Sequence, residues 1–141
     1  MESNRGKVIL VDTSAWIEFL RATGHPAQMT LKQHLMQRSP IATTEVVIME
    51  LLAGTRSRGE HTRLRTRLFA FPQLTLRGLL DFEQAAELYR MCRYKGETVR
   101  KLIDCLIAAV AIRTGATVLH NDRDFEVLAR HTRLRTEPFM R

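Results

Sequence analysis

Four consecutive apolar residues near the start, Val8-Ile9-Leu10-Val11, show no alternation of polar and apolar side chains. This pattern is typical of a strand buried on both faces, as in a parallel sheet covered by helices. Ile41-Ala42 and residues 117–120 offer two further short strands. Segments of helical pattern separate these runs. The sequence therefore predicts an α/β fold in three layers, with a mostly parallel central sheet flanked by helices.

The helical segments are bounded by capping and breaking residues. Asp12 and Asp122 are each candidates for the N-cap of the helix that follows, and Asp81 with Gln84 resembles a capping box. Gly54 closes a helix at its C-terminal end. We expect helices at residues 13–20, 26–38, 44–53, 58–69, 81–94, 99–113 and 123–130, and weak strands at 74–76 and around Leu134. The hexamer at 61–66 recurs at 131–136, and we expect a helical first copy and an extended second copy.

Length and composition narrow the class of protein. The 141 residues, 45% of them hydrophobic, suit one domain spanning residues 1–141. No apolar run reaches the roughly 18 residues that span a bilayer, so we expect no membrane association and a cytoplasmic location. Cys92 and Cys105 are the only cysteines, which argues against a disulfide framework or zinc. The net charge of +7 favours a polyanionic partner but does not identify it.

Several acidic residues occur where burial is expected. Asp12 ends the first strand and Asp122 follows the last one, while Glu50 and Asp104 interrupt strongly apolar helical segments. Asp124 follows two residues after Asp122. A buried ionised carboxylate costs several kcal/mol or more unless something compensates it. Because the carboxyl ends of parallel strands meet at one edge of a sheet, these acids are expected to converge there.

A divalent cation would compensate such a cluster. Carboxylate oxygens select hard ions, so Mg²⁺ or Mn²⁺ is favoured over zinc. A cation of this kind activates water and stabilises the charge that builds on a phosphoryl group during hydrolysis. Each acid also has a plain structural reading. Asp12 and Asp122 would cap helices, Glu50 would reach solvent or an arginine, and Asp104 would pair with a basic residue one turn earlier.

These residues resemble the PIN-domain ribonucleases, and specifically the VapC toxins of toxin–antitoxin pairs. The resemblance is carried by four motifs in order, which are Val8–Ser14, Glu50–Gly54, Asp104–Ala109 and Asn121–Phe125. It implies a parallel sheet between helices, Mg²⁺-dependent endoribonuclease activity, homodimers and a cognate antitoxin. It also implies that Asp12, Glu50, Asp104 and Asp122 are catalytic metal ligands, with Asp124 assisting. His120 stands where the family more often has Thr or Ser.

Basic and hydroxyl residues near the acids are candidates for contact with RNA. Thr13 and Ser14 could bind a phosphate, although helix capping is their simpler role. Two basic groups could line a path for the phosphate backbone. The first comprises Arg56, Arg58, Arg63, Arg65 and Arg67, and the second Arg93, Lys95, Arg100 and Lys101. Leu64, Leu68 and Phe69, beside the first group, could form an antitoxin groove or a dimer face.

Other functions stay open on the sequence. A DNA-directed nuclease of the same fold would share the acids, and RNA and DNA cleavage would distinguish it. A Mg²⁺ phosphatase of the aspartyl-phosphate kind would want a second acid two residues after Asp12, where Ser14 stands. A non-catalytic RNA-binding module would have no need of Glu50 and Asp104 in apolar helices, and would bind RNA equally well with EDTA.

Overall fold

Within the part of the chain that the structure describes, the central sheet is parallel and has three short strands. In the computed structural model, which describes residues 7–140, the strand order is β2-β1-β3. The strands are β1 (Ile9–Val11), β2 (Ile41–Ala42) and β3 (Thr117–Leu119). Ile9 of the central strand lies opposite Ile41 on one side and Thr117 on the other. Every strand residue is buried, as the apolar runs predict.

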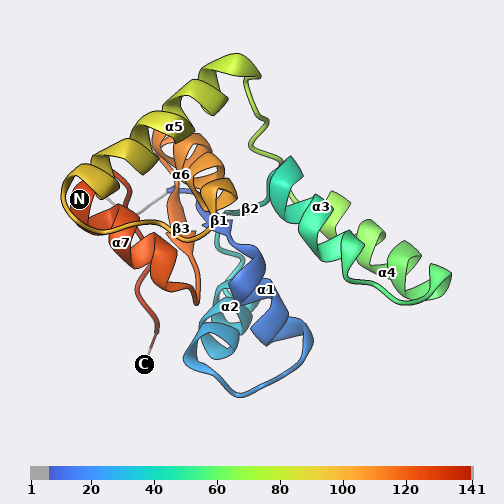
Figure 1. Ribbon diagram of the computed structural model, residues 1–141. Helices are drawn as coiled ribbons and strands as arrows, with labels where there is room; N and C mark the ends of the chain where they lie inside the picture. The colour runs from blue at the N-terminus through green and yellow to red at the C-terminus, as the bar shows by residue number, and fades with distance from the viewer. Residues whose placement is uncertain (1–6, 141) are drawn as a thin grey trace.

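Helices surround this sheet. They are α1 (Thr13–Leu20), α2 (Pro26–Met36), α3 (Glu45–Ala53), α4 (Arg58–Phe69), α5 (Leu79–Tyr94), α6 (Leu102–Thr114) and α7 (Arg123–His131). The strands lie between the α5–α6 pair and the α1–α2 pair, and the α3–α4 pair extends away from the rest of the molecule (Figure 1). The prediction of a parallel sheet flanked by helices is therefore confirmed. Among the described residues, no helix combines the length and the apolar character that crossing a membrane requires.

Helix α6 is the most deeply buried helix of the fold. Its residues from Asp104 to Ala111 are all buried, and it packs against β3, α5 and α7. Such a helix offers little solvent to a charged side chain. Asp104 is therefore in a place where an ionised carboxylate needs a compensating charge.

Two predicted weak strands are reduced to single bridges. Near the strand predicted at 74–76, Gln73 forms a single parallel bridge with Thr43. The amide of Leu76 donates to the carboxylate of Glu45 instead of to a neighbouring strand. At the second, Thr136 pairs with Val118 at the free edge of β3. The repeated hexamer behaves as expected, because its first copy lies in α4 and most of its second copy follows α7 without helical structure.

Two helices begin elsewhere than predicted. Helix α5 starts at Leu79, so Asp81 is not its N-cap, and the Asp81 carboxylate instead binds the guanidinium of Arg113 at 2.7 and 2.9 Å. Helix α6 starts at Leu102 rather than at residue 99. The preceding amides donate to the side chain of Asp124, a tertiary contact that overrides local helical preference.

Candidate metal centre

Asp12 lies at the carboxyl end of β1 and is only 3% exposed. It caps α1, because its Oδ2 accepts hydrogen bonds from the amide of Ser14 at 2.9 Å and from the Ser14 hydroxyl at 2.6 Å. Its second oxygen, Oδ1, is buried and has no hydrogen-bond partner. The capping role is therefore real, and it leaves one carboxylate oxygen unsatisfied.

Asp122 and Asp124 lie at the start of α7. Asp122 is the N-cap, with Oδ1 accepting from the amide of Asp124 at 2.9 Å and Oδ2 accepting from Nζ of Lys101 at 2.6 Å. Asp124 is completely buried, and its two oxygens accept from the amides of Arg100 and Lys101, each at 2.9 Å. Asp124 thus fixes the segment that enters α6.

Asp104, in the first turn of α6, faces these two acids. Carboxylate oxygens of Asp104, Asp122 and Asp124 all lie within 4.8 Å of one another, which is close enough for a shared ion. Asp104 is 2% exposed, and its Oδ2 has no hydrogen-bond partner. Burial, with the nearby charge of Asp12 as the next cause, raises the pKa of Asp104 to about 8.

The other acids differ in their electrostatic surroundings. Burial also raises the pKa of Asp12, and the nearby Glu50 adds to that rise. Burial acts in the same direction on Asp122, but the hydrogen bonds from Lys101 and from the Asp124 amide outweigh it, so the pKa of Asp122 lies below its usual value. The site therefore holds both a strongly ionised acid and acids whose ionised form is costly.

Glu50 lies on α3 at the side of Asp12. The hydroxyl of Thr13 donates to Glu50 Oε1 at 2.5 Å, which links the start of α1 to α3. Glu50 is half-buried and stands outside the group of three aspartates. All five predicted acids thus belong to one acidic region, although the structure places them at different depths within it.

Ser14 connects the two ends of the site. Its hydroxyl donates to Asp12 and accepts a hydrogen bond from the amide of Asn121 at 2.8 Å. The hydroxyl protons of Ser14 and Thr13 are therefore both committed to carboxylates within the site. The capping role predicted for Thr13 and Ser14 is wrong, because Asp12 is the N-cap of α1 and both residues lie inside the helix. Their predicted contact with a phosphate stays a prediction.

The donor set fits a hard divalent cation. Two buried carboxylate oxygens, one on Asp12 and one on Asp104, have no hydrogen-bond partner. An unsatisfied buried acceptor costs about 1–3 kcal/mol, more if charged, so such atoms call for an explanation such as an ion. Oxygen-only ligands favour Mg²⁺ or Mn²⁺ over softer metals.

The basic residues of the second predicted group divide into two pairs. Nζ of Lys101 lies 3.7 Å from Oδ2 of Asp104, and the guanidinium of Arg100 lies 3.9 Å from both Asp122 and Asp124. Arg93 instead stacks near Tyr89 of its own helix, and Lys95 is exposed at the end of α5.

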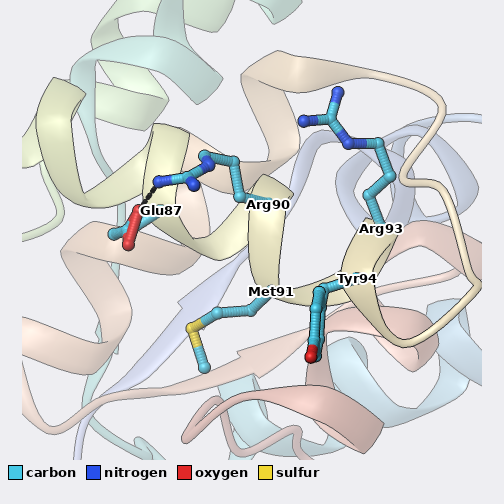
Figure 2. Close-up of a pocket in the computed structure, with 5 residues that line it drawn as sticks. All are labelled: Glu87, Arg90, Met91, Arg93 and Tyr94. Carbon is cyan, nitrogen blue, oxygen red and sulfur yellow. Dashed lines mark hydrogen bonds and ion pairs between the residues drawn. The ribbon is translucent and has the colours of Figure 1, made fainter.

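A shallow pocket on the surface of α5 includes Arg93. Its lining consists of Glu87, Arg90, Met91, Arg93 and Tyr94, and the ion pair between Glu87 and Arg90 measures 2.8 Å (Figure 2). Arg90 and Arg93 extend from one side of the helix while Met91 and Tyr94 extend from the other (Figure 2). None of the acids of the metal centre lines this pocket.

His120 has a local structural role. Its Nδ1 accepts from the amide of Asp122 at 3.1 Å, and its ring lies 5.2 Å from that of Phe125. Burial lowers the pKa of His120, which favours the neutral ring that this hydrogen bond requires. His120 therefore supports the N-cap of α7.

The basic face of α4 is exposed, but one part of the prediction for this helix is wrong. Its arginines are solvent-exposed, and Arg65 and Arg67 lie over the rings of Phe69 and Phe19. Leu68, expected on an exposed apolar face, is completely buried, because it is part of the hydrophobic core. Of the three apolar residues expected there, only Phe69 is exposed, at 45%, while Leu64 is partly buried.

Sequence reasoning missed the residue that holds the loop before α6. Glu97 accepts hydrogen bonds from Arg130 at 2.8 and 3.0 Å, contacts His131 Nε2 at 2.7 Å and pairs with Arg123. These contacts keep the pKa of Glu97 low, at about 2. No local pattern signals this role, because the partners are more than 25 residues away in the sequence.

Known proteins resemble this chain in sequence and in fold. The PIN domain family matches residues 9–131. Ribonuclease VapC11 of Mycobacterium tuberculosis is 44% identical over 133 residues, covering 94% of this chain and 99% of the relative. VapBC2 from Rickettsia felis bound to a promoter DNA fragment gives a TM-score of 0.71 at 20% identity, covering 94% and 99% of the two chains. A toxin–antitoxin complex from Klebsiella pneumoniae gives 0.63 at 26% identity, with 83% and 89% covered. The chain therefore belongs to the PIN-domain family, among the VapC ribonucleases.

Proposed function

We propose that this protein is a Mg²⁺- or Mn²⁺-dependent endoribonuclease that acts in the cytoplasm as the toxin of a toxin–antitoxin pair. The observation that carries the metal dependence is the pair of unpartnered, buried carboxylate oxygens on Asp12 and Asp104. The 44% identical relatives named as VapC ribonucleases support RNA as the substrate.

The acids would have different roles in binding the cation. Asp12, Asp104 and Asp122 would supply oxygens directly, and Glu50 would complete the acidic site beside Asp12. Asp124, with both oxygens on backbone amides, would act by positioning. When bound, the cation supplies Lewis-acid chemistry, by lowering the pKa of water and offsetting negative charge on the phosphodiester.

The remaining side chains would orient the ligands and attract RNA. Thr13 holds Glu50 and Ser14 holds Asp12, so each hydroxyl keeps a carboxylate in place. Arg100 is 68% exposed at the rim of the acids, which leaves its guanidinium accessible to a phosphate. The net charge of +7 and the exposed arginines of α4 favour a polyanion over the wider surface.

The proposed activity is tested on purified, antitoxin-free protein. Total cellular RNA and single-stranded DNA of matched length are incubated with wild type and with Asp104→Asn, in Mg²⁺, in Mn²⁺ and in EDTA. We expect cuts in RNA that need the metal and disappear in the variant. Cleavage of DNA alone favours the DNA-directed nuclease. Intact RNA that is still bound in EDTA favours a non-catalytic binding module.

An antitoxin is the proposed protein partner. Structural neighbours of the chain are toxin–antitoxin assemblies, among them a VapBC complex from Salmonella typhimurium. A basic toxin suits an acidic antitoxin segment. Co-expression with a candidate antitoxin that carries an acidic segment, followed by purification through a tag on one partner, tests this directly.

A second copy of the chain is the other proposed partner. Phe82 is 53% exposed and Leu102 58% exposed, on facing helices. They line an almost entirely apolar groove together with Ala85, Ala86, Ile103 and Leu106. Such a groove next to the metal centre suits a homodimer face. Light scattering of wild type and of Phe82→Asp is expected to show a dimer and a monomer, respectively.

A further inference from the structure

Lys101 places a positive charge inside the proposed metal centre. Its Nζ donates to Oδ2 of Asp122 at 2.6 Å and lies 3.7 Å from Oδ2 of Asp104. The side chain of Lys101 is 54% exposed, whereas those of Asp122 and Asp104 are 9% and 3% exposed. The ammonium group therefore reaches from the solvent side to oxygens that face the interior.

The backbone of Lys101 is held in place from two directions. Its amide and that of Arg100 donate to the buried carboxylate of Asp124, which gives this segment an extended conformation before α6. A few residues earlier, Glu97 is held by Arg130 and His131 of α7. The approach of the Lys101 side chain to the acids thus starts from a fixed point.

The ammonium neutralises only part of the acidic site. It satisfies Asp122 Oδ2, but Asp104 Oδ2 and Asp12 Oδ1 stay without hydrogen-bond partners. A divalent cation bound by the Oδ2 atoms of Asp104 and Asp122 would compete with Lys101 for those two oxygens. Two cations cannot share that space, because both the atoms and the charges would clash.

We propose that Lys101 is a tethered cation that competes with a divalent ion for the acidic site and must leave Asp122 when that ion binds. This inference rests on the proposed metal-dependent function and adds an exchange step to it. Metal uptake replaces one ammonium charge with two positive charges and frees Lys101 toward solvent. Lys101 consequently lowers the affinity of the protein for its metal, while its ammonium charge offsets the repulsion between Asp104 and Asp122.

The first test follows the Lys101 amine in the wild-type protein. Limited acetylation with acetic anhydride is quantified by peptide mass spectrometry, in EDTA and in saturating Mn²⁺. Loss of a charge-assisted hydrogen bond of 1.5–3 kcal/mol corresponds to a factor of about ten or more, so we expect about a tenfold rise in Lys101 acetylation with Mn²⁺. Lys32, exposed on α2, is the internal reference and should not change. Equal Lys101 acetylation in both conditions overturns the proposal.

The second test measures Mn²⁺ affinity by calorimetry. We expect Lys101→Met to bind Mn²⁺ about tenfold more tightly than wild type, because the competing cation is gone. Arg100→Met is the matched control, since it removes a neighbouring charge that lies 3.9 Å from Asp122, and its affinity should change about twofold or less.

The outcomes separate this inference from the proposed function. If wild type binds Mn²⁺ and Lys101→Met binds no more tightly, the tethered cation is refuted while the metal centre stands. If wild type binds neither Mn²⁺ nor Mg²⁺, the metal-dependent function falls and the exchange step falls with it.

Discussion

Asp104→Asn is expected to stabilise the metal-free protein while abolishing metal binding. The pKa of Asp104 rises from 3.8 in the unfolded chain to about 8 in the folded protein. Between these two values the folded state holds a proton that the unfolded state has released, so stability falls as the pH rises. The free energy of unfolding falls by about 1.4 kcal/mol per pH unit above the unfolded pKa, so Asp104 alone lowers it by about 4 kcal/mol at pH 7.

An asparagine removes this proton linkage. We therefore expect Asp104→Asn in EDTA to be more stable than wild type at pH 7 by up to about 4 kcal/mol, and close to wild type at pH 4. Urea unfolding at the two pH values, followed by circular dichroism, measures the difference. With Mn²⁺ added, the midpoint of wild type should rise and that of the variant should not.

Asp81→Asn is the matched control for this prediction. Asp81 is also 2% exposed, but the guanidinium of Arg113 keeps its pKa below the usual value. Removing this carboxylate should destabilise the protein by about 1–3 kcal/mol, because it leaves a partly buried cation unpaired. The reasoning is refuted if Asp104→Asn destabilises the metal-free protein at pH 7 as Asp81→Asn does.

Three further predictions concern pH and local order. Mn²⁺ affinity should rise up to about tenfold per pH unit from pH 6 to pH 8, because Asp104 must lose its proton when the ion binds, and calorimetry in several buffers would show that proton leaving. Asp124→Asn should lower the free energy of unfolding by about 1–3 kcal/mol and speed hydrogen exchange at the amides of Arg100 and Lys101. Each of these amides donates to its own oxygen of Asp124, whereas an asparagine has only one acceptor oxygen. Pairing with Arg113 lowers the pKa of Asp81 in the folded protein. The pair therefore contributes fully to folding stability above the unfolded pKa of about 3.8, and this contribution is lost as the pH falls through the folded pKa. The free energy of unfolding of Arg113→Met should depend less on pH between 5 and 2 than that of wild type.

Local patterns predicted the long elements of the fold well. Among the described residues, the strands and helices fall close to the predicted ranges, because short apolar runs mark the strands and capping or breaking residues bound the helices. The start of α6 was wrong because its first residues use a distant carboxylate, Asp124, as the acceptor for their amides. The strand at 74–76 was wrong for a similar reason, since Glu45 takes the amide of Leu76.

The acids of the site were predictable from the sequence, and its basic residues only in part. A carboxylate in an apolar segment is conspicuous in one sequence, so Asp12 and Asp104 were found from burial alone. The pairing of Asp104 with a basic residue one turn earlier is confirmed, because Nζ of Lys101 lies 3.7 Å from Oδ2 of Asp104. No local pattern signals the shorter contact of Lys101 with Asp122, and its predicted contact with substrate stays a prediction. Glu97 was missed because its partners lie on α7.

The capping and metal-binding interpretations of the acids are compatible at the level of single atoms. Asp12 uses one oxygen to cap α1 and leaves the other buried and unpartnered. Asp122 uses one oxygen to cap α7 and gives the other to Lys101. Each cap fixes the carboxylate plane, so the second oxygen keeps a defined direction without needing its own support. An aspartate N-cap at the end of a parallel strand therefore starts the helix with one oxygen and can present its second, ordered oxygen to an ion. This is why Asp12 and Asp122 are both helix caps and good candidates for metal ligands.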